Sequence, residues 1–172
     1  MEYLKDYRSP LGMITMASDG KALTGLWFEE QKYYAATLTG NEERKSLPVF
    51  DEVNEWLNCY FTGREPEFTP PLKLKVTPFR REVCEIMLTI PYGKTMTYKE
   101  IAEIIAKRRS VERMSAQAVG QAVGHNPISI IVPCHRVIGT DGSLTGYAGG
   151  IDKKISLLRL EGHEITAFKL PK

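Results

Sequence analysis

Residues 126–137, NPISIIVPCHRV, form an apolar run that ends in a cysteine and a histidine, and residues 142–150, GSLTGYAGG, follow as a glycine-rich loop. The run is typical of a buried, strand-like segment. It brings the thiol of Cys134 beside His135 and Arg136, where positive neighbours can stabilise a thiolate. By itself this pattern indicates only a candidate nucleophile, because an isolated buried cysteine is more often inert packing.

Helices are predicted immediately before this stretch. Residues 77–78, Thr-Pro, provide an N-cap and a proline at the first helical position, and the apolar periodicity that follows predicts a helix of about three turns. Residues 97–100, TYKE, match a capping box that opens a second helix. A third, rich in alanine and glycine, runs from about Ser115 to Val123. The basic residues 107–109 lie between these last two, which together predict a helix-turn-helix.

The first part of the chain predicts a small sheet with one helix. Residues 13–16 and 23–28 are rich in strand formers and are separated by a turn signal. Apolar residues at three- and four-residue intervals predict a helix over 48–61. The proline-rich residues 64–71 predict an interdomain linker, with a domain boundary near residue 72. The fold class is therefore α/β (α+β).

Composition narrows the functional class. The 172 residues are 42% hydrophobic with a net charge of +2, which is typical of a globular protein and does not by itself indicate a polyanionic partner. No apolar run is long enough for a membrane span, and the first residues lack the pattern of a signal peptide. The cysteines form no CxxC pair and are odd in number, which favours a reducing compartment. We therefore expect a cytoplasmic protein without membrane association.

The long motif around Cys134 closely resembles the active-site signature of the O6-alkylguanine-DNA alkyltransferases, also called methylated-DNA–protein-cysteine methyltransferases. The matching residues are Asn126-Pro127, 133–137 (PCHRV) and 146–150 (GYAGG). The resemblance spans the whole chain. It implies a ribonuclease-H-like N-terminal domain over 1–72, a C-terminal DNA-binding and alkyl-acceptor domain over 75–162, and a tail over 163–172.

This resemblance implies a DNA repair protein that irreversibly transfers an alkyl group, such as methyl, from O6-alkylguanine in double-stranded DNA to its own cysteine. Each molecule acts once, as a monomer, with base flipping and without a cofactor. Activity on O4-alkylthymine is left open. By similarity, Cys134 is the nucleophile, His135 a base that acts through water, and Glu161 the residue that orients the histidine. Asn126 holds the turn that carries the thiol, and Tyr98 donates a proton to the leaving base.

The resemblance also implies a base pocket and a DNA-binding face. The pocket consists of Tyr147, which stacks on the extruded base, with Ala148, Gly149, Val132 and Pro133. The small side chains of the third helix lie in the minor groove. The implied DNA contacts are Ser115, Ala116, Ala118, Gly120, Arg113 and Arg136, and the basic residues 107–109 are further candidates for phosphate contacts.

Two features depart from the commonest family pattern. Gln117 stands where the family usually has an arginine that inserts in place of the extruded nucleotide. We therefore expect flipping to persist with weaker DNA affinity. Residues 1–58 contain neither cysteine nor histidine, so the zinc site that some relatives carry in the N-terminal domain is not expected, and no metal site is predicted.

Three alternatives use the same residues. A catalytically inactive alkyltransferase-like protein would bind damaged guanine, but such proteins replace the acceptor thiol. The recognition helix of a helix-turn-helix regulator would carry arginine or asparagine side chains that contact the bases. The third predicted helix carries chiefly small residues instead. A cysteine hydrolase normally takes its histidine from a distant segment. The enzyme is preferred because Cys134 and its predicted partners are all present.

Overall fold

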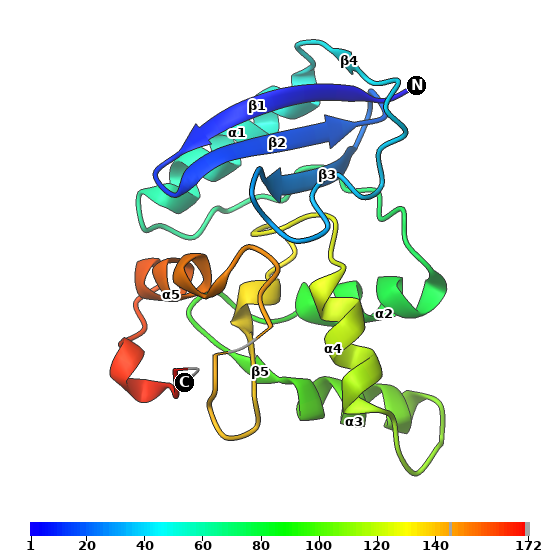
Figure 1. Cartoon of the computed structure of the whole chain (residues 1–172), viewed down its shortest axis with the longest axis vertical. Coiled ribbons are helices and arrows are strands. Elements are labelled where there is room, and N and C mark those ends of the chain that lie inside the picture. Colours follow the sequence, from blue (N-terminus) through cyan, green and yellow to red (C-terminus); the bar gives the residue numbers. More distant parts are fainter. Residues whose placement is uncertain (145, 171–172) are drawn as a thin grey trace. The chain divides into compact units, whose positions relative to one another are not determined.

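The computed structural model describes residues 1–144 and 146–170 and divides into two compact units (Figure 1). The N-terminal unit comprises residues 1–75 and 127–131. The C-terminal unit comprises residues 76–126 and, from residue 132 on, the rest of the chain. The last two residues of the predicted tail lie outside the described part. No helix in the described ranges is long and apolar enough to cross a membrane.

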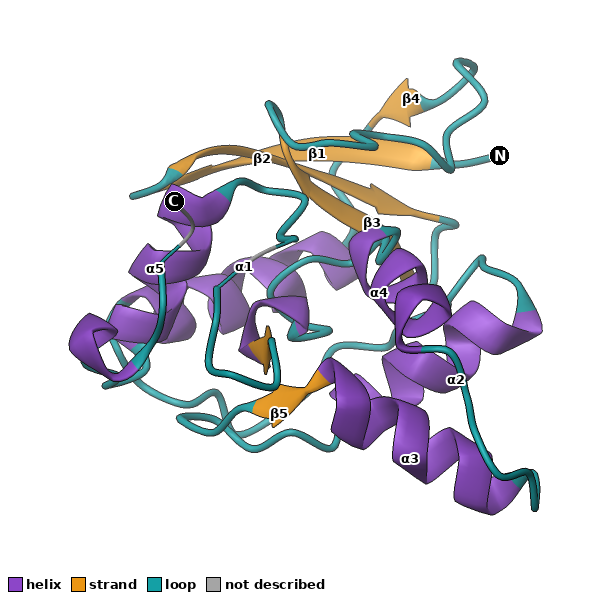
Figure 2. Cartoon of the chain, turned by 60° about the horizontal axis from the view of Figure 1, so that its bottom comes forward, coloured by secondary structure: helices purple, strands orange, loops and turns teal. Residues whose placement is uncertain are grey.

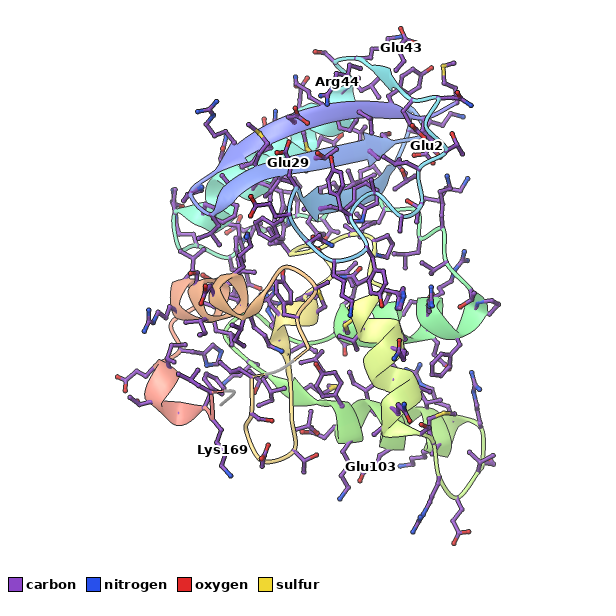
Figure 3. All side chains as sticks on the ribbon, in the orientation of Figure 1. Glu2, Glu29, Glu43, Arg44, Glu103 and Lys169 are labelled. Atoms are coloured by element: carbon purple, nitrogen blue, oxygen red, sulfur yellow. The ribbon has the colours of Figure 1, made fainter. Side chains whose placement is uncertain are left out.

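A four-stranded sheet forms the N-terminal unit, in the order β3-β2-β1-β4. Its strands are β1 (Tyr3–Ser9), β2 (Gly12–Ser18), β3 (Leu23–Phe28) and β4 (Glu43–Arg44). The first three pair antiparallel, and β4 runs parallel to β1. Figure 3 labels both side chains of β4, of which Arg44 forms an ion pair of 3.0 Å with Asp6 on β1.

Helix α1 (Pro48–Phe61) packs against β1 and β2 (Figure 1). Its bounds agree with the predicted helix. The residues that it buries recur every three or four positions, which places them on one face of the helix. They are Val49, Phe50, Val53, Trp56, Leu57 and Tyr60. This face and the apolar side of the sheet form the core of the unit.

The C-terminal unit is mainly helical. Its elements are α2 (Pro78–Met87), β5 (Met96–Thr97), α3 (Tyr98–Arg108), α4 (Ala116–Gly124), η1 (Cys134–Arg136), β6 (Val137–Ile138), α5 (Ile151–Leu160) and η2 (Ile165–Ala167). Helix α4 packs on both α2 and α3 (Figure 2). The short strands β5 and β6 pair in parallel, so the start of α3 lies beside the end of η1.

Side-chain caps fix where these helices begin. Thr77 accepts a hydrogen bond from the backbone amide of Arg80, and Ser115 accepts one from Ala118. Thr97 and Glu100 form both halves of the predicted capping box. Such caps satisfy amides that the first helical turn leaves without a partner, each contributing about 1 kcal/mol. Local sequence therefore sets the start of α2, α3 and α4.

The strand-like run predicted before Cys134 is not a strand. Ile128 forms a single bridge with Leu26, and Ile130 has a φ of 69°, in the left-handed region. The residues of the run are buried, and burial accounts for its apolar pattern without a strand. The segment before the thiol is therefore an irregular loop.

Candidate active site

Cys134 begins η1 with only 4% of its surface exposed. One carbonyl, that of Val132, accepts hydrogen bonds from the backbone amide of Cys134 at 2.8 Å and from Asn126 Nδ2 at 2.9 Å. Burial raises the pKa of the Cys134 thiol, while the Asn126 side chain and the positive charge of Lys154 act against that rise. The thiol therefore rests protonated among groups that favour its thiolate.

His135 and Glu161 form a buried pair, with Nε2 of the imidazole 2.6 Å from Oε2 of the carboxylate. Burial lowers the pKa of His135 from its ordinary 6.5, and the hydrogen bond to Glu161 opposes that shift. The imidazole is thus neutral at pH 7. Because an ionised carboxylate can only accept, Nε2 carries the ring proton and Nδ1 is the basic nitrogen.

Four hydrogen bonds converge on the carboxylate of Glu161, which caps the C-terminus of α5. Besides His135, the donors are Arg136 Nε at 2.8 Å, Arg136 Nη2 at 3.2 Å and the backbone amide of Gly93 at 3.0 Å. Burial alone would raise the pKa of Glu161, but His135 and Arg136 outweigh it and lower the pKa to about 2. Glu161 therefore remains ionised throughout the physiological range.

Arg136, which the sequence assigned to DNA, is instead 8% exposed and turned inward. In addition to Glu161, its guanidinium donates to the carbonyl of Ile90 at 2.7 Å and lies over the ring of Tyr92. These partners occupy Nε, Nη1 and Nη2 inside the unit. In the DNA-free protein, Arg136 is therefore bonded to Glu161 and Ile90, and its implied DNA contact stays a prediction.

Lys154 is buried close enough to affect Cys134, although no sequence motif pointed to it. It lies on α5 with no exposed surface and donates from Nζ to the carbonyl of Val137 at 2.6 Å. Burial lowers the pKa of Lys154 to about 8, and the negative charge of an ionised Cys134 opposes that shift. The helical spacing contained the signal, because Lys154 falls between Ile151 and Leu158 on an apolar stripe.

A hollow of about 500 Å³ in the C-terminal unit brings together several predicted residues. Its lining residues are Tyr98, Lys99, Ala116, Gln117, Gly120, Gln121, Gly139, Thr140 and Gly146. Burial, and to a smaller extent Cys134, raises the pKa of Tyr98 to about 12, so the hydroxyl keeps its proton. Gly146 has a φ of 75°, and a Cβ there would lie 3.2 Å from that hydroxyl oxygen.

Other predicted residues do not line this hollow. Val132 and Pro133 are buried, while Tyr147, Ala148 and Gly149 are half-buried in the loop before α5. The lining of the 500 Å³ hollow, drawn from the described residues, includes none of these five. The face predicted for DNA is more open: Ser115, Ala116, Gln117 and Arg113 are exposed, and Ala118 and Gly120 are half-buried.

The family was identified by comparison with known proteins. The ribonuclease-like domain model of 6-O-methylguanine DNA methyltransferase matches residues 3–74, and the DNA binding domain model matches residues 78–163. A methylated-DNA–protein-cysteine methyltransferase of Mycobacterium tuberculosis is 44% identical over 161 residues, covering 94% of this chain and 93% of the relative. One from Haemophilus influenzae is 40% identical over 160 residues, covering 92% and 86%.

Solved structures agree with these matches. The structure of M. tuberculosis OGT in complex with DNA has a TM-score of 0.80 and 43% identity, covering 92% of each chain. An O6-methylguanine DNA methyltransferase from Methanococcus jannaschii has a TM-score of 0.59 and 28% identity, covering 98% of this chain and 99% of that one. This chain therefore belongs to the 6-O-methylguanine DNA methyltransferase family.

Proposed function

We propose that this protein repairs DNA by transferring an alkyl group from O6 of guanine in double-stranded DNA to Sγ of Cys134. The observation that carries the proposal is the buried His135–Glu161 pair directly beside the acceptor thiol. Membership of the family supports the reaction class. Cys59, Cys84 and Cys134 are all free thiols, which supports a cytoplasmic location.

The transfer is a single displacement. The thiol proton moves to Nδ1 of His135 through a bridging water, and the sulfur attacks the alkyl carbon in line with the bond to O6. As the sulfur–carbon bond forms, the carbon–O6 bond breaks and its electron pair remains on guanine. The Tyr98 hydroxyl donates a proton to the leaving base, and the proton taken up by His135 then passes through solvent to the Tyr98 oxygen, which restores both neutral side chains.

The charges around Cys134 and His135 favour these proton and alkyl transfers. Glu161 is ionised in the resting protein and stabilises the imidazolium that forms on His135. Lys154 stabilises the developing negative charge on Cys134 until the alkyl group arrives. The product is a thioether, whose carbon–sulfur bond is stable in water. Each molecule therefore reacts once.

We propose that α3 and α4 form a helix-turn-helix that binds DNA. The N-cap Ser115 and the small α4 residues Ala116, Ala118 and Gly120 would lie in the minor groove, where they allow close approach of the backbone. Arg113 is exposed and free to approach a phosphate. At the C-terminal end of α3, Arg108 and Arg109 form ion pairs of 3.9 and 3.0 Å with Glu82, which leaves Lys107 as the better phosphate ligand among the basic residues 107–109.

The flipped guanine would enter a pocket formed by Tyr147 and its neighbours Ala148 and Gly149, together with Val132 and Pro133. An aromatic ring stacks well on an extruded base, and a glycine-rich loop lets backbone groups approach its edge. Gln117 would fill the space that the base leaves. It can hydrogen-bond the orphaned partner base but contributes no charge.

Intact-mass measurement tests the proposed function. After incubation with duplex DNA containing O6-methylguanine, the protein is expected to gain the mass of one methyl group, located on the peptide that carries Cys134. Cys134→Ala should gain none. Repeated turnover would indicate a hydrolase, and DNA binding without a mass gain would indicate an inactive damage-binding protein. Either result contradicts the proposal.

The insertion role of Gln117 has a test of its own. Gln117→Arg is expected to tighten binding to duplex DNA roughly fivefold at low salt, because it adds a cation where the base leaves the stack. Gln121 lines the same hollow one turn further along α4, so Gln121→Arg adds the same charge at a different place. Fluorescence anisotropy at matched salt compares the two. If both variants bound duplex DNA with the same increase in affinity, the proposed insertion role of Gln117 would be wrong.

A further inference from the structure

The loop that precedes the acceptor thiol is docked on the edge of the N-terminal sheet. β3 is an edge strand of the sheet, and Leu26 on its outer edge forms two backbone hydrogen bonds with the loop, one to Pro127 and one to Ser129. The amide of Leu26 donates to the carbonyl of Pro127 at 2.8 Å, and the amide of Ser129 donates to the carbonyl of Leu26 at 2.9 Å. The loop thus belongs to the N-terminal unit, although the rest of the active-site motif does not.

A buried side-chain bond strengthens this docking. The hydroxyl of Ser129 donates to Oε1 of Gln31 at 3.1 Å, and the same oxygen accepts the backbone amide of Phe28 at 2.9 Å. Gln31 is 6% exposed and Ser129 is 2% exposed. A buried hydrogen bond that is lost leaves its remaining partner unsatisfied, so both groups resist displacement.

The chain turns sharply after Ser129. The amide of Ile131 donates to the carbonyl of Ser129 at 2.8 Å, closing a γ-turn whose central residue, Ile130, has a φ of 69°. A β-branched residue with positive φ is strained, and such a conformation persists only where the surroundings hold it. The anchor at Ser129 supplies the fixed point on one side of this turn.

The other side of the turn leads directly to the thiol. Val132 follows Ile131, and its carbonyl accepts from both Asn126 and the amide of Cys134. Asn126 precedes the docked loop and Val132 follows it. The loop is therefore held at its base by Asn126 and at its tip by the edge of β3.

We propose that Gln31 and Ser129 are positioning residues for the alkyl-acceptor thiol. By fixing the tip of the loop, they keep the strained turn at Ile130 closed and hold the Val132 carbonyl where it aligns Asn126 and Cys134. This proposal rests on the proposed function, since alignment of the thiol matters most for attack on an alkyl carbon. In this proposal, Gln31 of the N-terminal sheet domain helps to position the thiol through its hydrogen bond with Ser129, which lies 98 positions later in the sequence.

Single-turnover kinetics of Ser129→Ala test the proposal. At saturating O6-methylguanine DNA, the rate constant for methyl transfer is expected to fall about tenfold, because small misplacements of a reacting group are costly. The dissociation constant for DNA should stay within about twofold, since this loop is not among the proposed DNA contacts. Gln31→Met, which removes the shared acceptor, should have the same effect.

A matched control is available in the same unit. Ser18 is fully buried and its hydroxyl donates to the carbonyl of Ala22 at 2.6 Å, away from the docked loop. Ser18→Ala should therefore lower thermal stability by a similar amount and leave the transfer rate of the folded protein unchanged. If Ser129→Ala and Gln31→Met transfer methyl as fast as Ser18→Ala, the positioning role is overturned.

A second measurement does not depend on the proposed function. Iodoacetamide modification of DNA-free protein, followed on the Cys134 peptide by mass spectrometry, should slow about threefold or more in Ser129→Ala relative to Ser18→Ala, since Asn126 then supports the thiolate less well. An unchanged rate contradicts the anchor even if methyl transfer is confirmed. Failure of the wild-type protein to gain a methyl group would instead contradict the proposed function alone.

Discussion

Glu161→Gln is expected to slow methyl transfer roughly 10³-fold and to lower the free energy of unfolding by about 3–5 kcal/mol. The carboxylate accepts from His135, Arg136 and Gly93 at once. Glutamine offers one oxygen and an amide group that can only donate. The variant therefore leaves the Arg136 charge buried without its counter-ion and can reverse the tautomer of His135.

The pH dependence of the unfolding free energy tests whether the ionised carboxylate of Glu161 is what stabilises the folded protein. A carboxyl whose folded pKa is depressed stabilises the native state above its unfolded value, here 4.5, and that contribution disappears as the pH falls toward about 2. Urea titrations from pH 6 to 2 should show this acid limb in the wild-type protein and a smaller one in Glu161→Gln. Glu164, which is exposed, provides the control Glu164→Gln. If Glu161→Gln showed the same acid-dependent loss of stability as Glu164→Gln, the proposed role of the Glu161 carboxylate would be wrong.

Lys154→Met is expected to slow methyl transfer about tenfold at pH 7, because loss of the Lys154 charge raises the pKa of Cys134 further and leaves less thiolate. Methionine has a similar length but no charge. The unfolding free energy should change by only about 1 kcal/mol, because relief from burying a charge offsets the lost hydrogen bond to Val137. Activity and stability should therefore respond differently.

The rate profile against pH distinguishes charge from packing. Because the pKa of Lys154 is lowered to about 8, the wild-type lysine loses its charge as the pH rises through that value. The wild-type advantage over Lys154→Met should therefore shrink between about pH 7 and pH 9. Lys154→Arg, which keeps the charge, should retain more activity than methionine, and Lys94→Met on the surface should have no effect. A constant ratio across this range would mean that Lys154 acts through packing.

Local signals in the sequence were sufficient for much of the fold. The bounds of α1 follow from its apolar periodicity, and the starts of α2 and α3 follow from Thr77 and Thr97, whose caps act within three residues. In such cases the partner is encoded next to the residue that needs it. The chemistry-bearing Cys134 and His135 were also evident, because their motif is contiguous.

Interactions between distant positions were not predictable in the same way. The inward turn of Arg136 depends on Glu161, which is 25 residues further along the chain, and on the carbonyl of Ile90, 46 residues before it. A sequence shows that an arginine is present but not whether its donors find a buried carboxylate. The irregular path at Ile130 was hidden for a related reason, since a buried loop and a buried strand share the same apolar composition.

The docking of residues 127–131 on β3 also bears on how the protein folds during synthesis. The outer edge of β3 exposes unpaired backbone groups at Leu26 until the ribosome has produced Pro127 and Ser129. The N-terminal unit therefore cannot complete its sheet edge as an independent nascent domain, although its other strands and α1 are encoded before residue 62. Completion of that edge and formation of the loop that carries the thiol are one late event in translation.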